Sequence, residues 1–449
     1  METPLYNKLL KYHNENRISF SMPGHKGKID KSLIDLDVTE LFKTADLHNE
    51  SDEVRNANML LKKLYGSDFS FILSSGSTTA IQAMLASALS PGQTLLASSD
   101  CHMSVINACM VMGINLRICD KVIDNEFSIP SRHTDIVKYL DKFPDISAVL
   151  ITSPNYYGLC ADIKQIAKEC HKHNLPLLVD EAHGAHFIAS SMFPKSSIKY
   201  ADLVCHSAHK TLNALTGAAY LHVREGLISH KRVRQCINIF ESSSPSYPIA
   251  ASADVARYEL ENSKNDWDTT IDRCIEFSNK IRSLGLNVLD NDDRTRIVIN
   301  FNGFNIKGYD IDTLLSDNKI DVEMSDFKNI VLIVTPKNTQ SDFDGLFEVL
   351  KKIISDCKIE TESVCFNVPP HNDIIRPQKA FWGKSTSVAI TDSVNKTSSS
   401  TVTAYPPGTP LIITGEKITE EHITTILNLK KNGAKITGMN NEEIEIISE

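Results

Sequence analysis

Short apolar runs alternate with segments of helical spacing from about residue 54 to residue 260. The predicted strands are apolar and most run into polar residues: SFILSSG (70–76), TLLAS (94–98), AVLITSP (148–154), PLLVDEAHG (176–184) and DLVCHSAHK (202–210). The predicted helices lie between them, at 78–89, 102–113 and 161–174. Nearly continuous apolar strands separated by helices indicate a parallel sheet covered on both faces. We therefore expect an α/β fold here.

The pattern changes after about residue 265, where the elements suggest a smaller α+β domain. Helical spacing is predicted at 274–285 and 343–357, and strands are predicted at 296–304 and 329–336. Residues 358–408 are rich in Pro, Ser and Thr, which favours a mostly irregular segment over a third domain.

The chain therefore divides into three expected parts. Residues 1–44 form an N-terminal arm, in which 1–20 are predicted to be a short polar helix. Residues 45–265 form the large domain, and 266–449 form the C-terminal small α+β domain.

Composition narrows the class of protein. The 449 residues carry 47 Lys+Arg and 56 Asp+Glu, a net charge of -9 that argues against a nucleic-acid partner. No stretch approaches the roughly 18 uncharged apolar residues of a membrane span, and the start of the chain lacks the apolar segment of a signal peptide. The ten cysteines include no CxxC pair, which is typical of reduced thiols. These features predict a cytoplasmic enzyme.

Polar clusters follow the predicted strands, at the edge where parallel sheets bind ligands. Ser74-Ser75-Gly76-Ser77-Thr78 opens a helix, so its hydroxyls and backbone N–H groups suit a phosphate, although an ordinary helix cap has the same composition.

The later clusters also have features of two other kinds of site. Asp180-Glu181 after an apolar strand resembles the metal-binding strand of a P-loop ATPase, but Gln378 stands where the first glycine of a phosphate loop before Gly383-Lys384-Ser385 is required. Four histidines near strand ends form two H-x-x-H pairs that suit a metal hydrolase: His183, His186, His206 and His209. Loop histidines at that spacing are more often hydrogen-bonded structural residues.

Lys210 changes the balance between these alternatives. A lysine just after a buried strand is desolvated, which lowers its pKa and makes the neutral amine a nucleophile. Together with Asp180 at the end of a strand and the hydroxyl-rich helix start, it supplies three parts needed to hold pyridoxal 5′-phosphate. The lysine would bond the cofactor, the aspartate would face its ring nitrogen, and the helix start would bind its phosphate.

A series of stretches along almost the whole chain is similar to a known family. They are SMPGHKG (21–27), SSGSTTAIQAM (74–84), DCHMSV (100–105), TSPNYYGLCADI (152–163), LLVDEAHGAH (177–186), HSAHKTLNALTG (206–217), SSSPSYPIAAS (242–252) and YPPGTPLIITGE (405–416). Singly, PGHK or DEAH is a weak signal, but the ordered series is specific. The sequence resembles the ornithine/lysine/arginine decarboxylase family of fold-type I pyridoxal-phosphate enzymes, in its short bacterial form.

The resemblance assigns expected roles at matching positions. Lys210 is similar to the lysine that bonds the cofactor, Asp180 to the carboxylate facing the ring nitrogen, and His102 to the residue stacked on the ring. His209 corresponds to an active-site acid or base, and His183 would face the hydroxyl edge of the cofactor.

The resemblance also implies a phosphate site and a dimer. Ser77, Thr78 and Ser207 would bind phosphate. Because the family buries its sites at a dimer interface, Ser244-Pro245-Ser246 is expected to serve the neighbouring subunit of a homodimer.

Three places depart from the family pattern. Asn49-Glu50-Ser51-Asp52 replaces the usual Pro and Gly, Ser75-Gly76 replaces Asn-Gly, and Met103 stands where Lys is common. The first of these lies where the family has its substrate entrance, so the choice of substrate is the property most affected. Carboxylates at Glu50, Asp52 and Glu53 suit either attraction of a cation or a solvated acidic loop.

The resemblance implies decarboxylation of lysine, arginine or ornithine, giving CO₂ and a diamine or agmatine for polyamine metabolism. The absence of an N-terminal receiver-like domain before Pro23 favours a dimer and biosynthesis over acid resistance. An aminotransferase or lyase of the same fold type, and a catalytically silent binding or regulatory homologue, are the alternatives. An aminotransferase would hold the substrate carboxylate through an arginine, for which Arg294, Arg296 and Arg376 are the candidates.

Overall fold

A computed structural model describes residues 44–448 apart from 121, 125–126, 360–368, 373 and 406–408. Before residue 44 it describes 14–15, 17–21, 24–26, 28, 30, 32 and 36–40.

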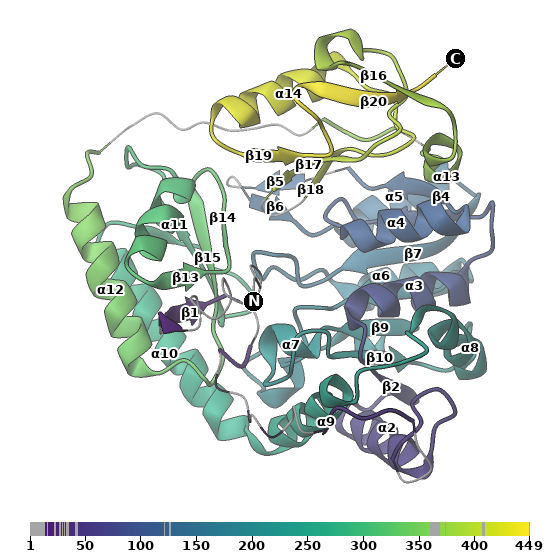
Figure 1. The fold of residues 1–449 in the computed structure, drawn as a ribbon, viewed down its shortest axis with the longest axis horizontal. Coiled ribbons are helices and arrows are strands. Elements are labelled where there is room, and N and C mark those ends of the chain that lie inside the picture. The colour runs from purple at the N-terminus through teal and green to yellow at the C-terminus, as the bar shows by residue number, and fades with distance from the viewer. Residues whose placement is uncertain are drawn as a thin grey trace, which may run out of the picture.

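A seven-stranded sheet forms the centre of the large domain, in the order β2-β10-β9-β8-β7-β3-β4 (Figure 1). The strands are β2 (Phe69–Leu73), β3 (Thr94–Ala97), β4 (Asn115–Ile118), β7 (Ile146–Thr152), β8 (Leu177–Asp180), β9 (Leu203–His206) and β10 (Ala219–Val223). The β4, β3, β7, β8 and β9 strands are parallel, whereas β10 runs antiparallel to both β9 and β2. The predicted α/β fold with a mostly parallel sheet is confirmed.

Alternation along the strands fills a core on each face of this sheet. In β7, Val149 and Ile151 pack on one side and Ala148 and Leu150 on the other. The second side is covered by α3 (Gly76–Ala88), α4 (Met103–Met112) and α8 (His230–Phe240). The first side is covered by α2 (Asp52–Tyr65), α5 (His133–Lys142), α6 (Ile163–Lys172), α9 (Tyr247–Asn262) and the start of α10 (Lys264–Ser283). Burial on both faces explains why the strands read as continuous apolar runs.

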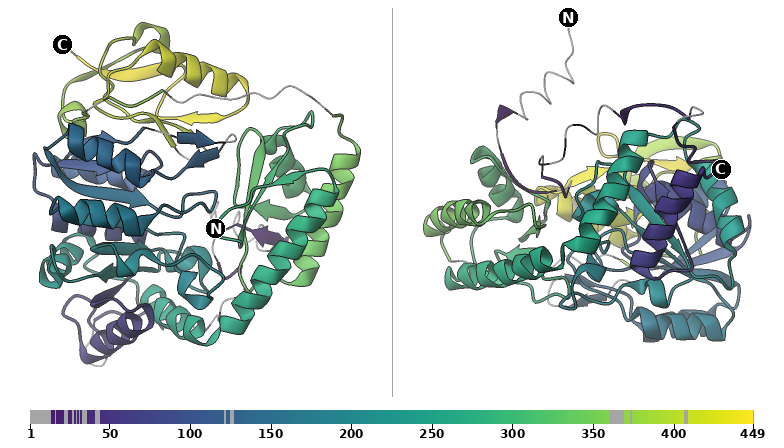
Figure 2. Two further views of the ribbon diagram at one scale, coloured as in Figure 1. Left: turned by 180° about the vertical axis from the view of Figure 1, so that it is seen from behind. Right: turned by 90° about the horizontal axis from the view of Figure 1, so that it is seen from below.

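A smaller antiparallel sheet lies beside the large domain, in the order β11-β12-β15-β14 (Figure 2). Its strands are β11 (Asn287–Val288), β12 (Arg296–Asn300), β14 (Met324–Ser325) and β15 (Asn329–Ile333). It packs with α10, α11 (Gly308–Asp317) and α12 (Gln340–Ser355) around a separate apolar core.

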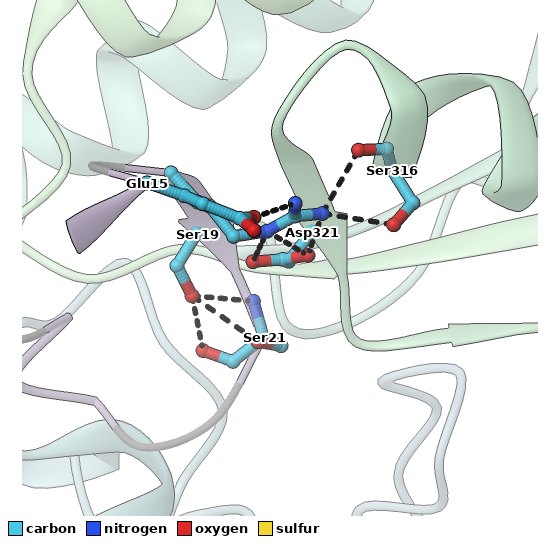
Figure 3. Close-up of polar contacts among 6 residues, drawn as sticks. Glu15, Ser19, Ser21, Ser316 and Asp321 are labelled. Carbon is cyan, nitrogen blue, oxygen red and sulfur yellow. Dashed lines mark hydrogen bonds and ion pairs between the residues drawn. The ribbon is translucent and has the colours of Figure 1, made fainter. Parts of the chain in front are cut away.

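The N-terminal segment also joins this part of the molecule. Residues 1–20 were expected to be helical, but β1 (Ile18–Phe20) is a strand that pairs in parallel with β13 (Ile320–Val322), while 1–13 and 16 lie outside the described residues. Arg17 fixes this pairing, because its Nε and Nη2 atoms donate to the Asp321 carboxylate at 2.6–2.9 Å and Nη2 also donates to Ser316 (Figure 3). The last three residues of the expected helix are thus a strand, which lies next to a long-range charge-assisted contact.

The C-terminal residues form a further body with its own apolar core (Figure 1). Its elements are α13 (Pro377–Phe381), β16 (Ser385–Ala389), β17 (Val402–Tyr405), β18 (Thr409–Ile412), α14 (Glu420–Lys431), β19 (Lys435–Thr437) and β20 (Glu443–Ile447). The segment 358–408, expected to be mostly irregular, therefore contributes α13, β16 and β17 among its described residues. Backbone bonds between Ile375 and Leu116 connect this region to the edge strand β4.

The remaining described elements are short. They are a hairpin of β5 (Val122–Asp124) and β6 (Phe127–Ile129), the one-turn helix α7 (Ala208–Thr211), and 3₁₀ turns at Phe187–Ala189, Ser197–Lys199 and Ile390–Asp392. Within the described part of the chain, no helix has the length and apolar character needed to cross a membrane.

Candidate active site

Four strand ends meet where the predicted site residues lie. Asp180 is the last residue of β8, and Lys210 lies in α7, directly after β9. His102 precedes α4 just after β3, and Ser77 lies in the first turn of α3 after β2. The carboxyl ends of parallel strands share one edge of a sheet, so the topology gathers residues that are far apart in sequence.

Lys210 is partly buried and its amine contacts a histidine. The distance from Lys210 Nζ to His183 Nε2 is 3.0 Å, and His183 Nδ1 lies 2.9 Å from Nη2 of Arg296. Burial lowers the pKa of Lys210, and the Asp180 carboxylate opposes this shift. Burial also places the pKa of His183 well below its usual value, and the positive charges of Lys210 and Arg296 act in the same direction. The structure therefore favours a neutral histidine beside a lysine that loses its proton easily.

Asp180 presents a carboxylate in a nearly dry environment. Its side chain is 4% exposed, and Oδ1 accepts hydrogen bonds from the backbone N–H of Ala182 at 3.1 Å and from the thiol of Cys205 at 3.4 Å. Its charge raises the pKa values of Lys210 and His102, so these three groups interact electrostatically within one site. A buried carboxylate of this kind is suited to stabilise a positive charge facing it.

Two of the three predicted phosphate-binding hydroxyls lie together. The hydroxyl of Ser207 donates to Oγ of Ser77 at 2.7 Å, at the N-terminus of α3. The side chain of Thr78, the third predicted residue, is exposed. Backbone N–H groups at the start of a helix have no partner within the helix, so this end of α3 favours an anion.

His102 and His209 each have one ring nitrogen fixed by a local contact. Nδ1 of His102 accepts from the backbone N–H and the hydroxyl of Ser104 at 3.2 and 2.8 Å. Nδ1 of His209 lies 3.0 Å from the carbonyl oxygen of Ala218 and donates to it. Burial lowers the pKa of both rings. Both are thus oriented neutral imidazoles next to Lys210.

The four histidines considered as metal ligands have separate partners. His183 bonds Lys210 and Arg296 as above, and His209 bonds a backbone carbonyl. His206 Nε2 lies 2.7 Å from Glu181, and His186 Nε2 lies 3.3 Å from Asp293. Among the residues that the structure describes, no group of three or more His, Cys, Asp or Glu side chains is arranged to hold a metal ion. The H-x-x-H pairs instead connect the strands through hydrogen bonds.

Two charged residues from outside the large domain act on this site. The sequence suggested Arg296 only as the carboxylate-binding arginine of an aminotransferase, and it did not single out Glu323. Arg296, the first residue of β12, is 2% exposed and contacts His183. Glu323 accepts a hydrogen bond from Tyr156 at 2.8 Å, and its charge raises the pKa values of Lys210 and Lys26. A charged residue directly before an apolar strand was the available signal for Arg296. That signal also fits a solvated strand end.

The acidic loop, the first of the departures from the family pattern, makes contacts of its own. Asp46 accepts from the backbone N–H groups of His48 and Asn49, and Glu50 accepts from Asn58 and Arg234. Asp52 forms an exposed pair with Arg55. The acidic loop is therefore tied to neighbouring side chains by local hydrogen bonds and ion pairs.

This set of donors fits pyridoxal 5′-phosphate. The amine can bond an aldehyde, the buried carboxylate can face a ring nitrogen, and the hydroxyls at the start of α3 can bind a phosphate. The neutral imidazole of His102 is suited to pack on a ring. The chemistry of the side chains present thus matches each part of the group.

Comparisons with known proteins agree with this geometry. The family model described as Orn/Lys/Arg decarboxylase, major domain, matches residues 3–300, and that of the C-terminal domain matches residues 366–443. YaaO, an uncharacterized protein of Bacillus subtilis, is 32% identical over 96% of this chain and 94% of its own length. An arginine decarboxylase of Halalkalibacterium halodurans is 30% identical over 97% of this chain and 95% of its own length.

A solved structure has the same fold. The lysine decarboxylase LdcF of Francisella novicida superposes with a TM-score of 0.80 at 20% identity, covering 99% of this chain and 81% of that chain. The matched family model spans the large domain and the start of the smaller sheet, including every residue of the site except Glu323. The chain therefore belongs to the Orn/Lys/Arg decarboxylase family of fold-type I pyridoxal-phosphate enzymes.

Proposed function

We propose that this enzyme removes the α-carboxylate of lysine, arginine or ornithine, releasing CO₂ and a diamine or agmatine. The observation that carries the proposal is the convergence of Lys210, Asp180 and His102 at one sheet edge, next to the Ser77–Ser207 pair. Bound pyridoxal phosphate supplies a ring that accepts the electrons of the breaking bond between Cα and the carboxylate.

Each residue has a proposed role toward that group. Lys210 would bond the aldehyde of the cofactor, and Asp180 would hold a proton on the ring nitrogen. His102 would pack on the ring. The hydroxyls of Ser77 and Ser207, with Thr78 at the helix start, hold the phosphate. These roles follow from the burial and contacts described above and from the family positions.

Two histidines complete the site. His183 would lie at the hydroxyl edge of the cofactor, since its Nε2 is 3.0 Å from Nζ of Lys210. His209, oriented through Nδ1, offers Nε2 as the group that moves a proton at Cα.

Glu323 supplies the preference for a cation in this proposal. Glu323 lies between β13 and β14, yet its carboxylate acts electrostatically on Lys210, so it lies within range of a substrate bound there. Hydrogen bonding to Tyr156 holds it in place. An acidic group beside the reactive amine attracts the positively charged side chain of a basic amino acid.

We further propose that the protein works as a cytoplasmic homodimer in polyamine metabolism. Ser244-Pro245-Ser246 precedes α9, and Ser244 is exposed, which suits a contribution to the site of a neighbouring subunit. Size measurement in solution, with and without cofactor, tests the dimer: a monomer at micromolar concentration contradicts it.

Product analysis tests the reaction. The purified chain is loaded with pyridoxal phosphate and incubated with carboxyl-labelled lysine, arginine and ornithine. Release of labelled CO₂ with an equal amount of amine supports the proposal, whereas a keto acid indicates an aminotransferase and no turnover indicates a silent homologue. Lys210→Ala should abolish both turnover and borohydride-trapped cofactor. Lys199→Ala, which removes an exposed lysine, should leave both unchanged.

A further inference from the structure

Three nitrogen-bearing side chains, two of them buried and the third partly buried, form a row from the smaller sheet to the reactive lysine. Arg296 begins β12, His183 lies in the loop after β8, and Lys210 lies in α7. Nη2 of Arg296 is 2.9 Å from Nδ1 of His183, and Nε2 of His183 is 3.0 Å from Nζ of Lys210. Arg296 and His183 are 2% and 5% exposed, so water does not compete for the contact between them.

The guanidinium of Arg296 determines which nitrogen of His183 carries the ring proton. A guanidinium has only N–H donors and does not lose its proton in proteins. Nδ1 of His183 must therefore accept the hydrogen bond from Arg296. A neutral imidazole carries one ring proton, which in this arrangement resides on Nε2. That N–H points at Lys210, whose amine can accept only when it is unprotonated.

We propose that Arg296 is a positioning residue that fixes the tautomer of His183 and thereby holds the Lys210 amine as an unprotonated acceptor. The inference rests on the proposed role of Lys210, because the neutral amine is the form that reacts with an aldehyde. With cofactor bound, the same Nε2–H is a donor available to the oxygen on the ring edge.

Other charged groups around Lys210 also influence whether its amine is protonated. Burial and Arg296 favour the neutral amine, and the acidic groups oppose them. The groups that act on Lys210 or on its imidazole neighbour are Asp180, Glu323, Cys205, Arg296, His102 and His209. Two carboxylates would stabilise a protonated lysine, and the N–H of His183 acts against them by donating to the neutral amine.

The backbone holds Arg296 in position from several directions. Its N–H donates to Asp293 at 2.9 Å, and its carbonyl accepts from Asn291 at 2.6 Å. Asp293 in turn contacts His186, in the loop that also carries His183. Gly158 has φ +79, and a Cβ there would lie 2.8 Å from Cβ of Arg296. The smaller sheet and the large domain must therefore pack correctly before Arg296 reaches its partner.

The direct test is the tautomer of His183 in the full-length, cofactor-free chain. Histidine labelled with ¹³C and ¹⁵N distinguishes Nε2–H, Nδ1–H and the protonated ring by chemical shift, and His183→Asn identifies the signal. We expect Nε2–H from pH 6 to pH 8. If the unmodified protein shows Nδ1–H or a protonated ring, that result alone overturns the proposal.

The variants separate the donor from a general structural role. Arg296→Met should convert His183 to a mixture of forms, and Arg296→Lys, which is also only a donor, should keep Nε2–H. Arg294→Met removes a neighbouring arginine whose side chain is 43% exposed and paired with Asp290, and should change nothing. An unchanged His183 spectrum in folded Arg296→Met would refute the role of Arg296.

Reactivity of Lys210 gives an independent readout. Reductive methylation of Lys210, quantified by mass spectrometry across pH, should have its midpoint shifted upward in Arg296→Met. A shift of one pH unit corresponds to roughly a tenfold lower rate below the midpoint. Arg296→Lys should restore most of the rate, and equal curves for Arg296→Met and the unmodified chain count against the proposal. Neither readout needs turnover, so failure of the decarboxylase proposal in the product assay is distinguishable from failure here.

Discussion

Replacing Glu181 by alanine should destabilise the large domain strongly. Glu181 follows Asp180 and is 1% exposed. Its carboxylate accepts from His206 Nε2 at 2.7 Å, from the backbone N–H and hydroxyl of Ser197 at 2.9 and 2.8 Å, and from the hydroxyl of Ser196 at 2.6 Å. The contacts tie the end of β8 to β9 and to the 3₁₀ turn at Ser197–Lys199.

The magnitude follows from the donors that lose their acceptor. Ser196 is only partly buried and can turn to water, but the donors of His206 and Ser197 are buried. Each buried donor left without a partner costs about 1–3 kcal/mol. The lower end of that range, applied to these buried donors, gives a loss of about 3 kcal/mol or more in the free energy of unfolding.

Urea unfolding followed by tryptophan fluorescence measures this loss. Trp267 is 3% exposed in the core of the large domain, whereas Trp382 is 71% exposed, so a Trp382→Phe background isolates the useful signal. Glu276→Ala is the control, because its ion pair with Lys280 is exposed and should contribute less than about 1 kcal/mol. Cofactor binding should weaken as well, since Ser207 directly follows His206. A Glu181→Ala variant as stable as the control would refute the reasoning.

Three further predictions concern neighbouring features. Burial lowers the pKa of Lys26 to about 7, so above that pH the unfolded chain binds a proton that the folded chain has released. The free energy of unfolding should therefore rise between pH 7 and pH 10, by up to about 4 kcal/mol. Urea unfolding at several pH values measures this rise, which Lys26→Met should flatten. Glu323→Gln should lower kcat/KM for a cationic amino acid by about tenfold or more in the CO₂ assay, because it removes a charged partner, and an unchanged value would exclude Glu323 from recognition. A Cβ on Gly24 would lie 2.5 Å from the carbonyl oxygen of Leu212, so Gly24→Ala should displace α7 and reduce borohydride-trapped cofactor, whereas Gly226→Ala, with open space around it, should not.

The local pattern of the sequence determined the large domain and the centre of its site. Apolar runs that end in polar residues predicted β8 and β9, and parallel topology then implied that Asp180 and Lys210 lie at one edge. The antiparallel direction of β10 carries no such signal, because a strand buried on both faces has the same composition in either direction.

Only the tertiary structure decided which distant charges enter the site. Arg294 and Arg296 are separated by one residue and look alike in sequence, yet Arg294 forms an exposed pair with Asp290 and Arg296 is buried against His183. The same holds for Arg17, whose contact with Asp321 accompanies a strand at Ile18–Phe20, where the segment expected to be helical ends. Periodicity reports how a residue alternates with its neighbours along the chain. Partners more than a hundred positions away are instead set by how the two sheets pack, and that packing is what places Arg296 beside the reactive lysine.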